Sequence, residues 1–176
     1  MTDYFEFYGL PVSFNPDQVL VKKKFYEFSK RYHPDFFINE SDEKQAEVLE
    51  MSTVNNKAYQ VLSDPQRRLH YILELKEVLT EGENYVLPQS FLMEMMEVNE
   101  VLMDMQFDPD AEKLAALKNE VAGIEKAISD EIIALTSDFD VKSEAEQIKS
   151  LAAVKDLYYR NKYLLRIKDS IKAASK

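Results

Sequence analysis

The sequence contains no cysteine and only two histidines, His33 and His70. Without cysteine the chain has no disulfide, no thiolate metal site, no cysteine nucleophile and no iron–sulfur cluster held by its own side chains. Any zinc site would have to combine the two histidines with carboxylates. We therefore expect neither a metal nor any other cofactor.

Long apolar runs are also missing, and glycine is scarce. No stretch approaches the roughly 18 apolar residues of a membrane span. The start, MTDYFEF, lacks the basic and long apolar segments of a signal peptide. We expect a soluble cytoplasmic protein that does not act at a membrane. Only three glycines and a hydrophobic fraction of 45% favour helices around a sizeable core.

Positive charge is in the minority. The formal net charge is −10 and the pI is about 4.8. Because nucleic acids are held chiefly through their phosphates, this balance argues against a nucleic-acid partner. A local basic patch remains compatible with it.

All six prolines fall where a helix should begin or end. Three follow a capping residue, in the pairs Asn15-Pro16, Asp64-Pro65 and Asp108-Pro109, which is the N-cap and N1 order. Ser41 is the expected cap of a further helix. No alternating apolar and polar stretch indicates a strand, so the expected fold class is all-α. The expected helices cover 3–8, 17–32, 42–62, 65–75, 89–105, 109–137 and 142–173, with a loop at 33–40.

The helical pattern is interrupted between 76 and 90, where Gly82 and Pro88 lie. We therefore expect one domain at 1–75, a linker at 76–88 and an antiparallel three-helix domain at 89–173. In the helix expected at 109–137, apolar residues spaced by three and four form a seam for packing. The seam consists of Leu114, Leu117, Val121, Ile124 and Ile128.

The helix expected at 17–32 has two different faces at 100° per residue. Its apolar stripe consists of Val21, Phe25, Phe28 and Tyr32. Its opposite, basic face consists of Lys23, Lys24, Lys30 and Arg31. A lone basic cluster is usually a solvated face. Here it belongs to an acidic chain and runs into His33-Pro34-Asp35, which favours a docking surface for an acidic partner.

The tripeptide His33-Pro34-Asp35 is a weak candidate for catalysis. A His–Asp pair needs a nucleophile or a metal, and the sequence has neither a Gly-x-Ser-x-Gly elbow nor a His-Glu-x-x-His helix. A hydrolase would require turnover that depends on His33, and nothing else in the sequence asks for one. We expect no enzyme. Taken alone, the tripeptide is also an ordinary turn.

Three segments together resemble a J-domain. DYFEFYGLP, RYHPD and NKAYQVLSDPQRRLHY match that family's DYYxxLGV, KYHPD and AYxVLxDPxxRxxYD in the same order, over about residues 3–75. The resemblance implies a helical hairpin whose loop presents His33, Pro34 and Asp35 to a DnaK-type ATP-dependent chaperone and stimulates its ATP hydrolysis. The basic face would steer that association. Phe36 and Phe37 depart from the lysine frequent after the tripeptide.

The segment FLMEMMEVNEVL carries two apolar stripes on one expected helix. The first consists of Phe91, Met95, Val98, Leu102 and Met105. The second consists of Leu92, Met96 and Met103, with Met93 beyond it. A second stripe means either a deeply buried helix or an exposed binding face. Glu97 and Glu100 flank it, and methionine adapts to varied partner surfaces, so we favour a binding face.

The same segment is similar to FLMExxExREEL of the HscB family, whose J-domain is joined to an antiparallel three-helix domain. The resemblance implies that the second domain binds an IscU-type iron–sulfur scaffold and presents it to a HscA/DnaK-type chaperone. Asn99 replaces a frequent arginine, and Ala153 stands where the family has an aromatic. We expect a monomer. The alternative is a second domain that dimerises or binds a different client. The implied scaffold contacts are Leu92, Met93, Met96, Glu97 and Glu100.

Overall fold

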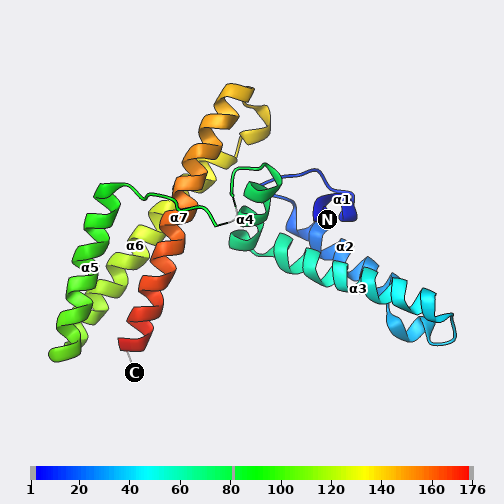
Figure 1. Cartoon of the computed structure of the whole chain (residues 1–176), viewed down its shortest axis with the longest axis horizontal. Coiled ribbons are helices and arrows are strands. Elements are labelled where there is room, and N and C mark those ends of the chain that lie inside the picture. Colours follow the sequence, from blue (N-terminus) through cyan, green and yellow to red (C-terminus); the bar gives the residue numbers. More distant parts are fainter. Residues whose placement is uncertain (1–2, 81, 175–176) are drawn as a thin grey trace. The chain divides into compact units, whose positions relative to one another are not determined.

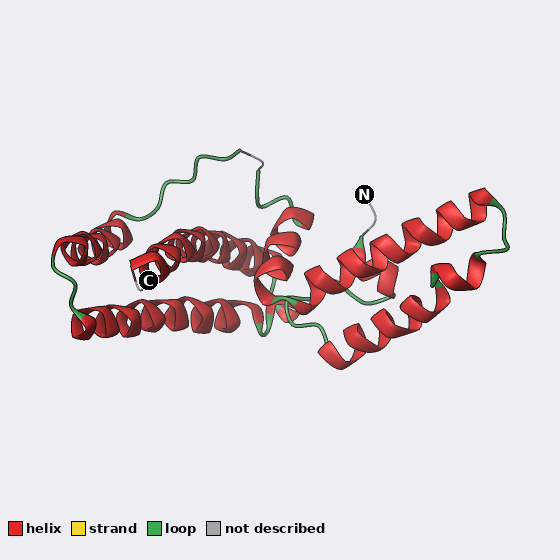
Figure 2. Cartoon of the chain, turned by 90° about the horizontal axis from the view of Figure 1, so that it is seen from below, coloured by secondary structure: helices red, strands yellow, loops and turns green. Residues whose placement is uncertain are grey.

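The computed structural model describes residues 3–80 and 82–174, and every regular element in these ranges is a helix (Figures 1 and 2). By contacts the chain divides into two compact units, Met1–Glu77 and Val78–Lys176. The expected all-α class, with a helical hairpin and a three-helix bundle, is confirmed. No helix within the described ranges is long and apolar enough to cross a membrane.

The first unit contains four α-helices and one 3-10 turn within its described part. Helices α2 and α3 run side by side as a hairpin, with the turn η1 at its far end (Figures 1 and 2). Helices α1 and α4 both pack against α3. The elements are α1 (Tyr4–Tyr8), α2 (Gln18–Arg31), η1 (Pro34–Phe37), α3 (Asp42–Ser63) and α4 (Pro65–Leu75).

The second unit is a bundle of three α-helices. Helix α7 packs against both α5 and α6, and the ends of α6 and α7 extend past α5 (Figure 1). The elements are α5 (Gln89–Phe107), α6 (Ala111–Thr136), the 3-10 turn η2 (Phe139–Val141) and α7 (Glu144–Ala174).

Two of the predicted helix starts are correct because a side chain with the right geometry caps each of them. Asp64 accepts hydrogen bonds from the N–H groups of Gln66 and Arg67, and Pro65 occupies the first helical position. Ser41 accepts from the Lys44 N–H.

The other two predicted N-caps are each wrong by two residues. Asn15 and Asp108 do not cap helices. Asp17 Oδ1 accepts from the N–H groups of Val19 and Leu20 at 2.8 and 3.3 Å. Asp110 likewise caps α6, and Asp108 is instead the residue that ends α5. In both cases a carboxylate two positions later takes the cap, so the proline precedes the helix.

A buried polar network joins three helices of the first unit. Asn55 is only 1% exposed on α3. Its Oδ1 accepts from the Tyr8 hydroxyl at 2.9 Å, and its Nδ2 donates to the Phe25 carbonyl and to Ser29 Oγ. Burial raises the pKa of Tyr8 well above its ordinary value, which keeps the hydroxyl a donor. Because buried polar groups need specific partners, this network fixes the register of α2 against α3.

The core of the second unit is apolar. The first stripe of α5 points inward, as predicted, and it packs with residues of α6 and α7. In the predicted seam of α6, Leu117, Val121 and Ile128 are buried, and Leu114 and Ile124 pack against the same cluster.

The segment that leads into α5 lies along α7. We call residues 83–87 the strap. The Tyr85 ring stacks on Tyr159 with 4.5 Å between centroids, and its hydroxyl donates to Asp156 Oδ1 at 2.7 Å. Glu83 pairs with Lys155 at 2.7 Å, and this contact lowers the pKa of the Glu83 carboxyl. Desolvation, and then the bond to Asp156, raises the pKa of Tyr85 to about 12.

Candidate functional site

The tip of the α2–α3 hairpin presents the tripeptide His33-Pro34-Asp35. Helix α2 ends at Arg31, and His33 is extended with φ −75° and ψ 123°. That conformation is the one a following proline favours. Pro34 then opens η1, a short turn that was not predicted within the loop at 33–40.

The geometry of the tripeptide decides which His33 nitrogen faces outward. The Asp35 N–H donates to His33 Nδ1 at 3.3 Å, and the Asp35 carboxylate lies 3.7 Å from the same nitrogen. Nδ1 therefore makes its contacts within the tip, and Nε2 is the ring nitrogen left for a partner. The His33 and Asp35 side chains are 50% and 77% exposed.

The tip is also held from α3. The Gln45 side-chain amide donates to the carbonyl oxygens of Ile38 and Glu40 at 3.1 and 2.9 Å. Phe36 and Ile38 are nevertheless 69% and 67% exposed, whereas Phe37 is partly buried. Within the described ranges no group of three or more metal-ligating side chains lies near enough to hold an ion. The tip is thus an exposed segment whose backbone is held by hydrogen bonds.

The four cations of the predicted basic face do not form one uniform patch. Lys23 and Lys30 are exposed, and neither has an ion-pair partner among the described residues. Lys24 lies 3.4 Å from Glu27 and 5.8 Å from the centre of the Phe28 ring.

Arg31 lies 5.4 Å from the centre of the Tyr32 ring. Lys24 and Arg31 thus border the apolar stripe, each beside one of its aromatic rings.

The second apolar stripe of α5 lies at the surface. Met93, Met96 and Met103 are 58%, 60% and 60% exposed, and Leu92 is partly buried at the edge of the core. Glu97 and Glu100 are exposed beside it, with no ion pair to any described residue. Helix α5 contains no lysine or arginine. Its outer face is therefore both apolar and acidic.

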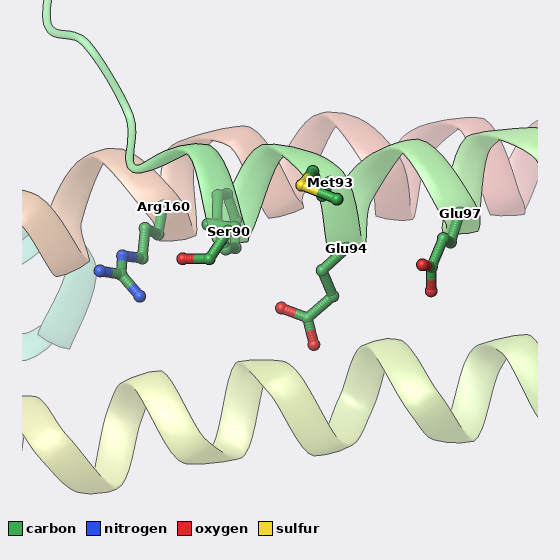
Figure 3. Close-up of a pocket in the computed structure, with 6 residues that line it drawn as sticks. Ser90, Met93, Glu94, Glu97 and Arg160 are labelled. Carbon is green, nitrogen blue, oxygen red and sulfur yellow. The ribbon is translucent and has the colours of Figure 1, made fainter.

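A shallow pocket of about 440 Å³ adjoins this face between α5 and α7. In Figure 3, Glu94 and Glu97 extend to the same side of α5, and Arg160 reaches in from α7. The Arg160 guanidinium bonds to Asp156 and lies 5.6 Å from the centre of the Phe91 ring. The pocket is lined by Ser90, Phe91, Met93, Glu94, Glu97 and Arg160.

Two residues of this region were missed from the sequence. Phe107, in the last turn of α5, is 87% exposed and continues the spacing of Met96, Glu100 and Met103, so the helical period carried a signal for it. Arg160 had none, because only tertiary packing brings it beside α5.

Comparisons with known protein families agree with both halves of the chain. The model of the DnaJ domain matches residues 3–71. The model described as the HSCB C-terminal oligomerisation domain matches residues 87–172.

Relatives and solved structures extend the likeness to nearly the full length. A co-chaperone protein HscB homolog of Vibrio cholerae serotype O1 is 32% identical over 158 residues, which are 88% of this chain and 92% of the relative. The structure of chaperone HscB from Vibrio cholerae has a TM-score of 0.71 at 27% identity, covering 99% of this chain and 98% of that one.

Human co-chaperone protein HscB has the same fold, with a TM-score of 0.78 at 24% identity, covering 99% of this chain and 83% of the human one. With an exposed His-Pro-Asp tip on one unit and the matching C-terminal bundle in the other, the chain belongs to the HscB family of J-domain co-chaperones.

Proposed function

We propose that this chain holds an IscU-type iron–sulfur scaffold through its second unit and stimulates ATP hydrolysis by a HscA/DnaK-type chaperone through its first. It performs no chemistry itself. The observation that carries the proposal is the outward-facing, backbone-held tripeptide at the hairpin tip of an HscB-family chain. Residues 1–75 are the proposed chaperone-binding domain and residues 89–173 the proposed scaffold-binding domain.

At the chaperone surface, each predicted residue has a physical role. His33 presents Nε2, Asp35 offers an exposed carboxylate, and Pro34 stiffens the turn between them. The basic face supplies long-range attraction toward an acidic chaperone surface, which mainly raises the association rate. This face consists of Lys23, Lys24, Lys30 and Arg31.

At the scaffold surface, the apolar side chains supply most of the affinity. Leu92, Met93 and Met96 offer adaptable apolar area. Glu97 and Glu100, exposed and without ion pairs in the described structure, are available to cations of the scaffold. Joining the two surfaces in one chain makes the second encounter intramolecular, which raises the effective concentration of scaffold at the chaperone.

The test measures ATP hydrolysis by the DnaK-type chaperones of the source organism, with this chain added and with or without its IscU-type scaffold. His33→Gln should abolish stimulation. The double change Leu92→Ala/Met96→Ala should abolish only the additional effect of the scaffold. Ile133→Ala, an exposed apolar residue on α6, is the matched control and should change neither. No stimulation of any chaperone by the unaltered chain would contradict the proposal.

A second candidate is that the exposed face of α5 joins two copies of this chain or binds a different client. The name of the matched C-terminal model, an oligomerisation domain, favours considering it. Sedimentation at increasing protein concentration distinguishes the two. A dimer that Leu92→Ala/Met96→Ala dissociates, together with unchanged scaffold binding, would assign this face to the dimer and not to the scaffold.

A further inference from the structure

The segment that follows the tripeptide differs in character from the basic face of α2. Residues 35–43, DFFINESDE, contain four carboxylates and no lysine or arginine. They also contain two strongly exposed apolar side chains, Phe36 at 69% and Ile38 at 67%. The cations of the basic face therefore end at Arg31. Beyond His33, residues 35–43 expose apolar side chains within an acidic segment.

The backbone that carries these two side chains is held in place. The Phe36 N–H donates to the His33 carbonyl at 3.1 Å, and the Glu40 N–H donates to the Phe37 carbonyl at 3.0 Å. The Gln45 side-chain amide donates to the carbonyls of Ile38 and Glu40, on either side of Asn39. The Phe36 ring also lies 5.5 Å from the His33 ring, centre to centre. A backbone segment fixed before binding loses less entropy on binding, so the placement of Phe36 and Ile38 is preorganised.

The position of Phe36 and Ile38 beside His33 indicates which partner they contact. Whatever receives His33 must also face Phe36, because the two rings are adjacent. An acidic surface continued past His33 would meet Asp35, Glu40 and Asp42 and be repelled. The receiving surface must therefore change from acidic to apolar beside the tripeptide. A second copy of this chain fits poorly, because two tips would bring like charges together.

We propose that Phe36 and Ile38 form a second, apolar contact with the same DnaK-type chaperone that receives His33-Pro34-Asp35, seated on a hydrophobic strip beside the tripeptide's site. This inference rests on the proposed function and adds a determinant of which chaperone the chain accepts. Chaperones whose corresponding surface is acidic throughout are disfavoured.

The test titrates the full-length chain against the chaperone and follows stimulated ATP hydrolysis. Phe36→Ala/Ile38→Ala should raise the half-maximal concentration about tenfold or more, because the complex no longer buries the two apolar side chains. Phe36→Leu/Ile38→Val should restore most of the affinity. Val19→Ala, an apolar residue 76% exposed at the other end of α2, is the matched control and should have no effect.

The outcomes separate this inference from the proposed function. If His33→Gln abolishes stimulation while Phe36→Ala/Ile38→Ala leaves the half-maximal concentration unchanged, the inference is overturned and the co-chaperone function stands. If the loss is not restored by Phe36→Leu/Ile38→Val, the contact is not apolar and the inference is again overturned. If His33→Gln has no effect, the proposed function itself fails. A change in the sedimentation of the chain alone would assign the pair to self-association instead.

Discussion

The two candidate surfaces of this chain are built in opposite ways. The hairpin tip is a loop whose polar groups are oriented by backbone and side-chain hydrogen bonds, with cations on the adjoining helix. The outer face of α5 is a regular helix that presents methionines and carboxylates and no cation. Directional contacts depend on exact placement, whereas methionine contacts tolerate variation. The two candidate surfaces of this acidic chain thus differ in charge and in chemistry.

The two units also differ in a buried feature. In the first unit, beside its apolar core, a polar network around Asn55 fixes α2 against α3 through hydrogen bonds. Beneath the outer face of α5, the inward stripe of that helix packs into an apolar cluster with α6 and α7.

Removing the polar network should have the largest effect. Asn55→Ala removes the side-chain bonds to the Tyr8 hydroxyl, the Phe25 carbonyl and Ser29 Oγ and leaves Tyr8 only its bond to the Asn55 carbonyl. We expect a loss of about 2–4 kcal/mol in the stability of the first unit. Hydrogen exchange should show lower protection in α2 and α3 and none of the loss in α6. Asn56→Ala, an exposed neighbour on the same helix, is the control. An equal loss of protection in both units would contradict the expectation that Asn55 stabilises only the first unit.

Reversing charge on the basic face should break the electrostatic half of the comparison. Lys23→Glu/Lys30→Glu should lower the association rate with the chaperone by about tenfold at low salt. For the unaltered chain, this rate should fall as salt rises. Lys118→Glu/Lys149→Glu makes the same change in net charge on exposed positions of the second unit and should have little effect. Chaperone binding that is indifferent to ionic strength would rule out the basic face.

Neutralising the carboxylates on α5 should have a smaller effect. Glu97→Gln/Glu100→Gln should weaken scaffold binding by about two- to threefold, because exposed ion pairs contribute little in water. Isothermal titration at two salt concentrations measures both the affinity and its salt dependence. Lys126→Gln on α6 is an exposed control outside the face. A loss larger than that of Leu92→Ala/Met96→Ala would show that charge rather than apolar contact dominates at α5.

The smallest expected effect concerns the strap. The pKa of Tyr85 is raised from 10.0 to about 12, so folding favours the neutral phenol. Its contribution to stability is complete below pH 10 and is lost as the pH rises through about 12. Tyrosinate absorbance of the unaltered chain minus that of Tyr85→Phe should show a step near pH 12. A step near pH 10 would mean that the phenol is neither desolvated against α7 nor bonded to Asp156.

Much of this structure was predictable because its signals are local. Helical period and caps such as Asp64 and Ser41 gave the order of the helices and their approximate ends. The same reasoning put two caps at Asn15 and Asp108, whereas an aspartate two residues later, Asp17 or Asp110, takes each cap. The helical period of α5 predicted a second apolar stripe, but it did not decide whether that stripe is buried or exposed.

The remaining features depend on tertiary pairing. Nothing in the sequence places Arg160 at the rim of the pocket or Tyr85 on Tyr159, because those partners are far apart along the chain. The network of Asn55 was invisible for the same reason. Its residues lie on three helices, and an asparagine in a helical pattern is ordinarily a surface residue.

The strap has a consequence for how the chain withstands proteases. A protease needs an accessible stretch of backbone that it can draw into its active site. Glu83 and Tyr85 are fastened to α7. Only residues 76–82 therefore separate the end of α4 from the strap. A cut there would separate the two compact units, and each piece would keep one candidate surface. Because the strap is fastened to α7, it shortens the stretch of backbone in which such a cut can fall.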